Sequence, residues 1–395
     1  MHFVNRPRLR PVGLVAVSAV LAAVLATGST AARADEAGVT PTVTAEAPTP
    51  PAPAPGDTVV GELVQAYADP APQTAGHEGG NDEAGPDDTL LSWVQTGSGD
   101  TVRVSTEDVA EVPTGATVEV TVGAAVQDEA TADGYAPALE VLSADVVAAP
   151  MSDQQTTAQT TAPVNHPVTV VMLHPAGAAR DGATLDQVVA AVNGPVGDFW
   201  ERQSAGAVRV GVTGTVDWFQ GTTTCADPYA LWSEAAARAG WSYAAGRHLL
   251  VYVPAGAPGC SYGLGEVRQD MSSGGRIYVQ AMATSVLAHE LGHNFGLNHS
   301  SQLQCDGRVE GPAPACQVSS YRDYYDVMGI SWDQVGTVSA LHQAQLGVLT
   351  AAQRVDVTST SAPAEHTLSP ISGTGGTRAL RLTAANGAVY WVEYR

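Results

Sequence analysis

The chain has 395 residues, with 40 Asp and Glu against 18 Lys and Arg, which gives a formal net charge of −22. Because binding to phosphate groups requires a basic surface, this charge argues against nucleic acids and anionic membranes as partners. An acidic surface instead favours solubility outside the cell.

Residues 1–34 have the pattern of a secretory signal peptide. A basic start at Arg6–Arg10 precedes an apolar run over Val12–Ala26, and Ala32–Ala34 reads as an A-x-A cleavage pattern. The apolar run is short for a bilayer, and no other segment of the sequence is apolar for the length of a membrane span. The sequence therefore predicts a secreted, extracellular protein that is not inserted in a membrane after signal cleavage.

Residues 35–56 are rich in Pro, Ala and Thr, a composition that cannot build a core and predicts a linker. Residues 57–147 predict a small β-rich domain, a barrel or a sandwich, because Thr117–Val122 alternates polar and apolar residues as a half-buried strand does. The expected strands are Thr89–Gln95, Thr101–Ser105, Ala116–Gly123 and Ala138–Val147. Residues 148–163 are polar and predict a second linker, which is a candidate processing site.

Residues 164–350 alternate expected strands and helices, which predicts a mixed α/β (α+β) domain. The expected strands are His166–Leu173, Val208–Val216 and His248–Val253, and the expected helices are Leu185–Gln203, Tyr229–Ala239 and Thr337–Leu346. A further strand, Arg276–Gln280, is expected to form the edge of the sheet, where an extended peptide could pair with it. The alternative for this strand is an ordinary covered edge.

The segment His289–His299 reads H-E-x-x-H-x-x-G-x-x-H and predicts a metal site. His289 and His293 are four residues apart, so they lie one turn apart on the same face of a helix. Gly296 is the expected end of this helix, because a left-handed backbone costs glycine little. The chain then reverses and brings His299 to the metal as a third ligand.

Glu290 lies beside the expected ligands without being one of them. Three neutral imidazoles leave one corner of a zinc tetrahedron open for water, whose pKa zinc lowers to about 7. Glu290 can accept the proton of that water as it attacks a carbonyl, and then pass the proton to the leaving amine. A buried cluster of three histidines without a metal is the weaker interpretation, since nothing would compensate for bringing the imidazoles together.

Residues Tyr324–Gly329 read YYDVMG, a Met-containing turn where this motif class expects one. Together, HELGHNFGLNH and YYDVMG resemble the metzincin superfamily of zinc endopeptidases, and within it the gametolysin-type secreted peptidases. The resemblance covers roughly Val164–Thr350. It implies zinc binding by His289, His293 and His299, a general base at Glu290, and a hydrophobic floor under the metal at Met328.

Two departures from related families bear on this resemblance. Some gametolysin-type peptidases carry Gln in place of the first histidine, whereas this chain has His289. Astacin-like metzincins place a tyrosine two residues after the turn methionine, where this chain has Ile330, so no tyrosine ligand is expected there. For the nearby Tyr324 and Tyr325, core or loop roles are favoured over stabilisation of an oxyanion.

All four cysteines lie within residues 164–350, and an even number in an exported chain favours disulfides. Of the three possible connectivities, we favour Cys225–Cys260 together with Cys305–Cys316. The second bridge closes a short loop and would stabilise the fold by roughly 2–3 kcal/mol on the chain-entropy account. Zinc binding by these cysteines is not expected, because none has C-x-x-C spacing. Calcium is compatible with an acidic exported protein, but no D-x-D-x-D-G loop supports a calcium site.

Residues 351–395 return to a β-rich composition and end in an apolar run, Val389–Arg395, that resembles the middle of a strand. Either this strand is terminal or the sequence is a truncated form of something longer. The β-rich residues 57–147 are either an inhibitory prodomain or an accessory module. No cysteine precedes Cys225, so a propeptide cysteine cannot silence the zinc, and any latency would come from steric cover or from another ligand side chain.

Three functions compete for this sequence. The first is a secreted zinc endopeptidase that hydrolyses extracellular proteins or peptides. The second is a catalytically silent zinc-containing binding protein on the same scaffold, which the intact Glu290 argues against. The third is a non-peptidase zinc hydrolase. The expected fold is a metzincin-like α/β domain with a helix-borne zinc site, between a β-rich N-terminal domain and a β-rich C-terminal segment.

Overall fold

The computed structural model describes residues 52–71, 89–150, 163–308, 311, 315–329 and 332–395. The predicted signal peptide, nearly all of the first linker and residues 151–162 of the second linker lie outside these residues. No helix in the described part of the chain is long and apolar enough to cross a membrane.

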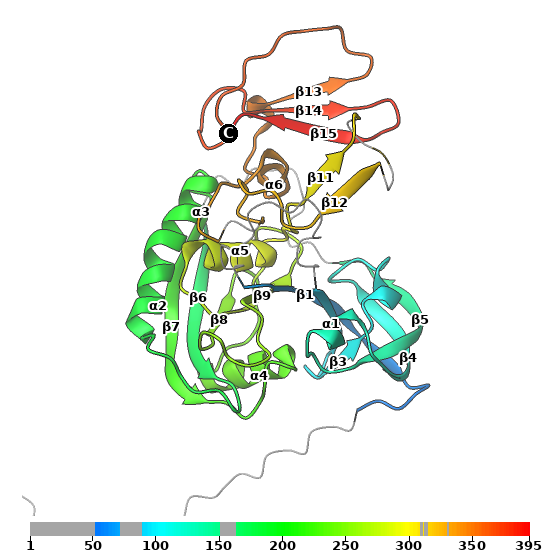
Figure 1. Ribbon diagram of the computed structural model, residues 1–395, viewed down its shortest axis with the longest axis vertical. Helices are drawn as coiled ribbons and strands as arrows, with labels where there is room; N and C mark the ends of the chain where they lie inside the picture. The colour runs from blue at the N-terminus through cyan, green and yellow to red at the C-terminus, as the bar shows by residue number, and fades with distance from the viewer. Residues whose placement is uncertain (1–51, 72–88, 151–162, 309–310, 312–314, 330–331) are drawn as a thin grey trace, which may run out of the picture. The chain divides into compact units, whose positions relative to one another are not determined.

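Five strands before residue 150 close on themselves as a barrel (Figure 1). They are β1 (Thr58–Asp69), β2 (Thr89–Thr96), β3 (Thr101–Val104), β4 (Thr117–Val126) and β5 (Ala138–Ala148). β1 pairs with both β2 and β4, and β3 and β5 complete the ring. A 3₁₀ turn (Glu107–Val109) and the short helix α1 (Glu129–Ala132) lie between strands. The four expected strands of this region are found, whereas β1 was not expected.

The residues from 163 to 300 form a mixed α/β layer structure. The strands are β6 (Val164–His174), β7 (Val208–Gln220), β8 (His248–Tyr252), β9 (Gly263–Val267) and β10 (Gly275–Val279). The helices are α2 (Leu185–Ala191), a π-helical turn (Val192–Val196), α3 (Gly197–Gln203), α4 (Pro228–Ala239) and α5 (Thr284–Asn294). The strand order is β9-β10-β8-β6-β7; β9 is antiparallel to β10, and the other neighbours are parallel.

Successive residues of these strands face two different cores, because strand side chains point alternately to opposite faces of a sheet. One face carries Val170, Leu250 and Ile277 and packs against α2, α3 and α5. The other face carries Val171, Val251 and Tyr278 and packs against α4 through Leu231 and Trp232. Helices on both faces explain why these strands read as nearly continuous apolar runs.

The structure corrects the prediction for Arg276–Gln280. This segment is not the edge of the sheet, because β10 lies between β9 and β8. The outer position belongs to β9, whose sequence Gly263–Val267 contains two glycines and gives little strand signal. β9 in turn pairs with the end of β1, which joins the barrel strands and the α/β strands in one sheet of 10 strands.

The expected helices are found with altered limits. Leu185–Gln203 is a continuous run of α2, the π turn and α3, with Pro195 inside the π turn. The last helix, α6 (Ala340–Gln345), is shorter than predicted, because Thr337 bridges to Asp326 and the Ser339 side chain caps the helix.

Both favoured disulfides are confirmed. Cys225 and Cys260 are bonded with Cα atoms 4.9 Å apart, and Cys305 and Cys316 are bonded with Cα atoms 4.1 Å apart. The second bridge joins β11 (Gln302–Cys305) to β12 (Cys316–Ser319). Beyond α6, a 3₁₀ turn (Ala351–Gln353) leads into a separate sheet of β13 (Arg354–Thr358), β14 (Ala379–Thr383) and β15 (Val389–Glu393).

Candidate metal centre

Helix α5 presents the first two histidines of the motif. Val286, Leu287 and Leu291 bury the apolar side of the helix in the core, and the side chains of His289 and His293 are fully buried. Because these histidines are one turn apart on one face, the packing of α5 fixes the direction of both imidazoles.

Gly296 ends the helical segment with a left-handed backbone, φ +86°. A Cβ atom at this position would meet the backbone oxygen of Gln269 at 2.7 Å, so a side chain would be both strained and blocked. The turn returns the chain toward α5, and the His299 side chain becomes almost completely buried next to His293, with their Nε2 atoms 3.1 Å apart.

Backbone carbonyls orient the two helix-borne imidazoles. The Nδ1 atom of His289 lies 2.8 Å from the oxygen of Val327, and the Nδ1 atom of His293 lies 2.8 Å from the oxygen of Leu297. An N–H at Nδ1 that donates to a carbonyl leaves the Nε2 lone pair of a neutral imidazole free to face a metal.

A fourth ligand atom comes from the last residue of β1. Nε2 of His289 lies 3.1 Å from Oδ2 of Asp69, and Nε2 of His299 lies 3.1 Å from Oδ1 of the same carboxylate. Asp69, His289, His293 and His299 each offer one ligand atom, and these four atoms all lie within 4.8 Å of one another. The sequence interpretation missed Asp69, since it lies far from the motif and outside any recognised pattern.

A cation bound between these ligand atoms explains their close approach better than direct contacts between the side chains do. Oδ2 of Asp69 and Nε2 of His289 are buried and have no hydrogen-bond partner within the described residues, although they are only 3.1 Å apart. A bare imidazole nitrogen and a carboxylate oxygen at this distance repel unless a proton or a cation lies between them. Three imidazoles and a carboxylate are also a ligand set that zinc accepts.

Glu290 is fully buried on the neighbouring side of α5, toward β9. A Cβ atom at Gly263 would meet its Oε1 at 1.8 Å, and one at Gly265 would meet its Oε2 at 2.7 Å. The two glycines of β9 therefore leave the space that the Glu290 carboxylate occupies. Burial, and then the charge of Asp69, raise the pKa of Glu290 well above its ordinary value.

The other buried groups respond to the same surroundings. Burial alone would raise the pKa of Asp69, but the electrostatic attraction of His289 and then of His299 holds it well below its ordinary value. Burial, followed by the charges of His299 and His289, holds the pKa of His293 well below its ordinary value. A low pKa keeps His293 neutral, which is the state that binds a metal.

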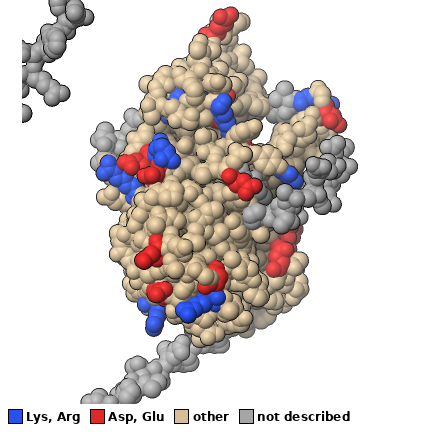
Figure 2. Space-filling model, turned by 60° about the vertical axis from the view of Figure 1, so that its left-hand side comes forward, with Lys and Arg blue, Asp and Glu red and all other residues tan. Residues whose placement is uncertain are grey.

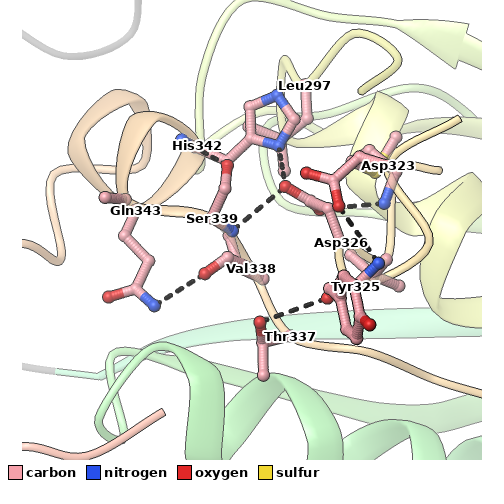
Figure 3. Close-up of polar contacts among 12 residues, drawn as sticks. Leu297, Asp323, Tyr325, Asp326, Thr337, Val338, Ser339, His342 and Gln343 are labelled. Carbon is pink, nitrogen blue, oxygen red and sulfur yellow. Dashed lines mark hydrogen bonds and ion pairs between the residues drawn. The ribbon is translucent and has the colours of Figure 1, made fainter. Parts of the chain in front are cut away.

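The turn that contains Met328 is held by the carboxylate of Asp326 (Figure 3). Oδ1 of Asp326 accepts the backbone N–H of Met328 at 3.0 Å, and Oδ2 accepts the N–H of Ser339 at 3.1 Å and lies 3.1 Å from Nδ1 of His342. Burial alone would raise the pKa of Asp326, but His342 and these backbone donors lower it to about 2.

Met328 lies fully buried beneath α5. A Cβ atom at Gly292 would meet its Sδ atom at 2.4 Å, so the turn and the helix are in close contact at the position expected for a hydrophobic floor. Tyr324 and Tyr325 are 47% and 66% exposed, in agreement with a loop role. Ile330 lies outside the described residues.

One family comparison matches the part of the chain that carries this centre. The model of the reprolysin-like metallopeptidases of family M12B matches residues 244–300, from just before β8 to just after His299. This match supports a relationship to zinc metallopeptidases. It does not test the more specific resemblance to gametolysin-type peptidases, which stays a prediction. A search of curated proteins found no match.

Proposed function

We propose that the chain is a secreted zinc-dependent endopeptidase that acts on extracellular proteins or peptides. The main support for this proposal is that three buried imidazoles converge next to the Glu290 carboxylate, directly beside β9. The side of β9 away from β10 could pair through its backbone with an extended peptide if β1 left it, and such pairing would bring a peptide bond to the centre.

His289, His293 and His299 would hold the metal through their Nε2 atoms. A zinc ion bound there would supply a Lewis acid that polarises a carbonyl and acidifies water. In this proposal Glu290 acts as the general base. One of its carboxylate oxygens accepts a proton from the attacking water and then donates it to the nitrogen of the leaving amine. The raised pKa of Glu290 favours its role as a base, because it makes the carboxylate a stronger proton acceptor than an ordinary glutamate.

Export is supported by the two disulfides, which form and persist in oxidising compartments. Figure 2 shows acidic and basic side chains interspersed over the described residues of the face drawn, without a continuous basic patch there. Protein or peptide substrates, rather than nucleic acids, are therefore part of the proposal.

A catalytically silent zinc protein is the second candidate, and Asp69 is the observation that favours it. A site with four protein ligands is typical of structural zinc, whereas catalytic sites keep one position open. Glu290 favours the peptidase, because a buried carboxylate beside the metal is unfavourable for a protein that has no use for a base.

Hydrolysis of an unfolded protein tests this choice. The full chain and the full chain with Glu290→Ala are loaded with zinc, the metal content of both is verified, and the products are followed by mass spectrometry. Cleavage by the unaltered chain alone supports the peptidase and its base. If neither protein cleaves although both hold zinc, the silent zinc protein becomes the better account.

A further inference from the structure

The end of β1 occupies the side of β9 that an extended substrate would need. Residues Gln65–Asp69 pair antiparallel with Val267–Gly263, residue by residue, while the other side of β9 is already paired with β10. Backbone pairing does not depend on side chains, so a substrate strand and β1 would compete for the same hydrogen-bonding groups.

Asp69 ends this strand at the metal centre. Its side chain is fully buried, and the hydroxyl of Tyr321 donates a hydrogen bond to Oδ1 at 2.8 Å. Its two oxygens lie 3.1 Å from the Nε2 atoms of His289 and His299. A buried carboxylate is unfavourable unless a cation compensates it, and a metal held by the histidines is the compensation that this site offers.

A second side chain of β1 covers the centre. Tyr67 is two residues before Asp69 and therefore lies on the same face of the strand. Its ring centroid is 5.3 Å from that of His293 and 4.2 Å from that of His299. Tyr67 and Asp69 together cover the ligands from the side on which a substrate would approach.

The strand is also anchored away from the metal. Glu62, in the first half of β1, forms an ion pair with the buried Arg268 at 3.0 Å, just beyond the end of β9. Past Asp69, in the other direction, the structure contains a cavity of about 490 Å³ lined by Thr89, Tyr135 and Gly259–Ser261. β1 thus fills the length of β9 and stops at the metal centre, where the open space begins.

We propose that Gln65–Asp69 is a built-in inhibitor that occupies the substrate side of β9 and gives the metal a fourth protein ligand, the carboxylate of Asp69. This inference rests on the proposed peptidase function. Cutting or displacing β1 would free both β9 and the fourth position of the metal, so activation and exposure of the centre would be one event.

The test uses the full chain as wild type, Asp69→Ala and Asp69→Asn, with Thr58→Ala, at an exposed position at the start of β1, as the control on the same strand. Each protein is loaded with Co²⁺ for its visible absorption spectrum, and with Zn²⁺ for the rate of metal release to a chelator. Loss of a carboxylate ligand should alter the cobalt spectrum and speed zinc release by about tenfold or more. Thr58→Ala should leave the cobalt spectrum unchanged, since Thr58 lies at the far end of β1 from the ligands.

Peptide hydrolysis by the same zinc-loaded proteins gives the second readout. Asp69→Ala frees the fourth position of the metal and removes the contacts with His289, His299 and Tyr321 that hold the end of β1 against β9. We therefore expect Asp69→Ala to cleave at least about tenfold faster than wild type, and Asp69→Asn, which keeps the shape of the side chain, to lie between them. An unaltered cobalt spectrum and zinc-release rate in both Asp69 variants would overturn the inference, even if the wild type cleaves with dependence on Glu290. An altered spectrum without cleavage by any variant would keep Asp69 as a ligand but overturn its role as an inhibitor.

Discussion

Helix α5 and strand β1 contribute to the same metal centre in different ways. α5 carries two ligands and Glu290 within one turn and a half, so their geometry follows from helix periodicity alone. β1 contributes Asp69 through its pairing with β9, and the partner Tyr321 that holds Asp69 lies 252 residues further along the chain. A ligand set inside one element can be recognised in a sequence, whereas a ligand delivered by strand register cannot.

The largest effect is expected at the helix. His293→Ala removes one of three imidazoles from the centre, and we expect the chain to lose its stoichiometric metal, which elemental analysis after dialysis measures. Asp69→Ala should retain the metal under the same conditions, because three imidazoles remain. Full metal retention by His293→Ala would refute the assignment of His293 as a ligand.

The metal centre could be predicted from the sequence only where its ligands lie close together along the chain. The spacing of His289, His293 and Gly296 predicted the helix and the turn after it, and the structure has these features. β9 was missed because Gly263 and Gly265 weaken its strand pattern, and those glycines are present to make room for Glu290. Asp69 was missed because its role depends on pairing between β1 and β9, which no local pattern specifies.

A second buried histidine group lies at the end of α5 and contrasts with the metal centre. Nδ1 of His166 lies 3.0 Å from Nε2 of His248, and Nδ1 of His248 lies 2.9 Å from Oδ1 of Asn294 at the end of α5. Here both ring nitrogens of His248 and Nδ1 of His166 meet hydrogen-bonding groups instead of converging on a carboxylate. Burial lowers the pKa of His166 to about 3 and that of His248 to about 4.

These two histidines predict a loss of stability in acid. Below pH 6.5 the unfolded chain binds protons at these histidines, while the folded chain does not until pH 4 or lower, so the free energy of unfolding falls over this window. Replacing one of them, as in His166→Phe, should make the loss between pH 7 and pH 4.5 smaller by about 2–3 kcal/mol. Urea unfolding of the zinc-loaded wild type and the zinc-loaded His166→Phe variant, at pH 7 and at pH 4.5, measures this difference. Identical pH dependence of the two proteins would contradict the lowered pKa of His166.

A smaller effect is expected in the turn beneath α5. Asp326→Asn removes the negative charge of the carboxylate that accepts hydrogen bonds from Met328, Ser339 and His342. This change should lower the free energy of unfolding by about 1–3 kcal/mol at pH 7. Because the folded pKa is about 2, the stabilisation by Asp326 is complete above about pH 4 and is lost as the pH falls toward 2. Asp323→Asn, a change in the same loop at a more exposed carboxylate, is the control and should cost less. Equal effects of the two substitutions would contradict this account of the turn.

The smallest effect is expected at Met328 itself. Met328→Leu nearly conserves volume and should cost less than about 1.5 kcal/mol, as judged from thermal unfolding, and leave the metal content unchanged. Loss of the metal in this variant would mean that Met328 does more than pack beneath the helix.

The position of the metal in crystals of the full chain tests most directly whether α5 and β1 share one centre. Anomalous scattering at the zinc absorption edge locates the ion without reference to activity. We expect one zinc within bonding distance of His289, His293, His299 and the carboxylate of Asp69. A zinc bound by the three histidines and solvent alone, with Asp69 turned away, would contradict the shared centre, and a zinc bound elsewhere would contradict the whole assignment.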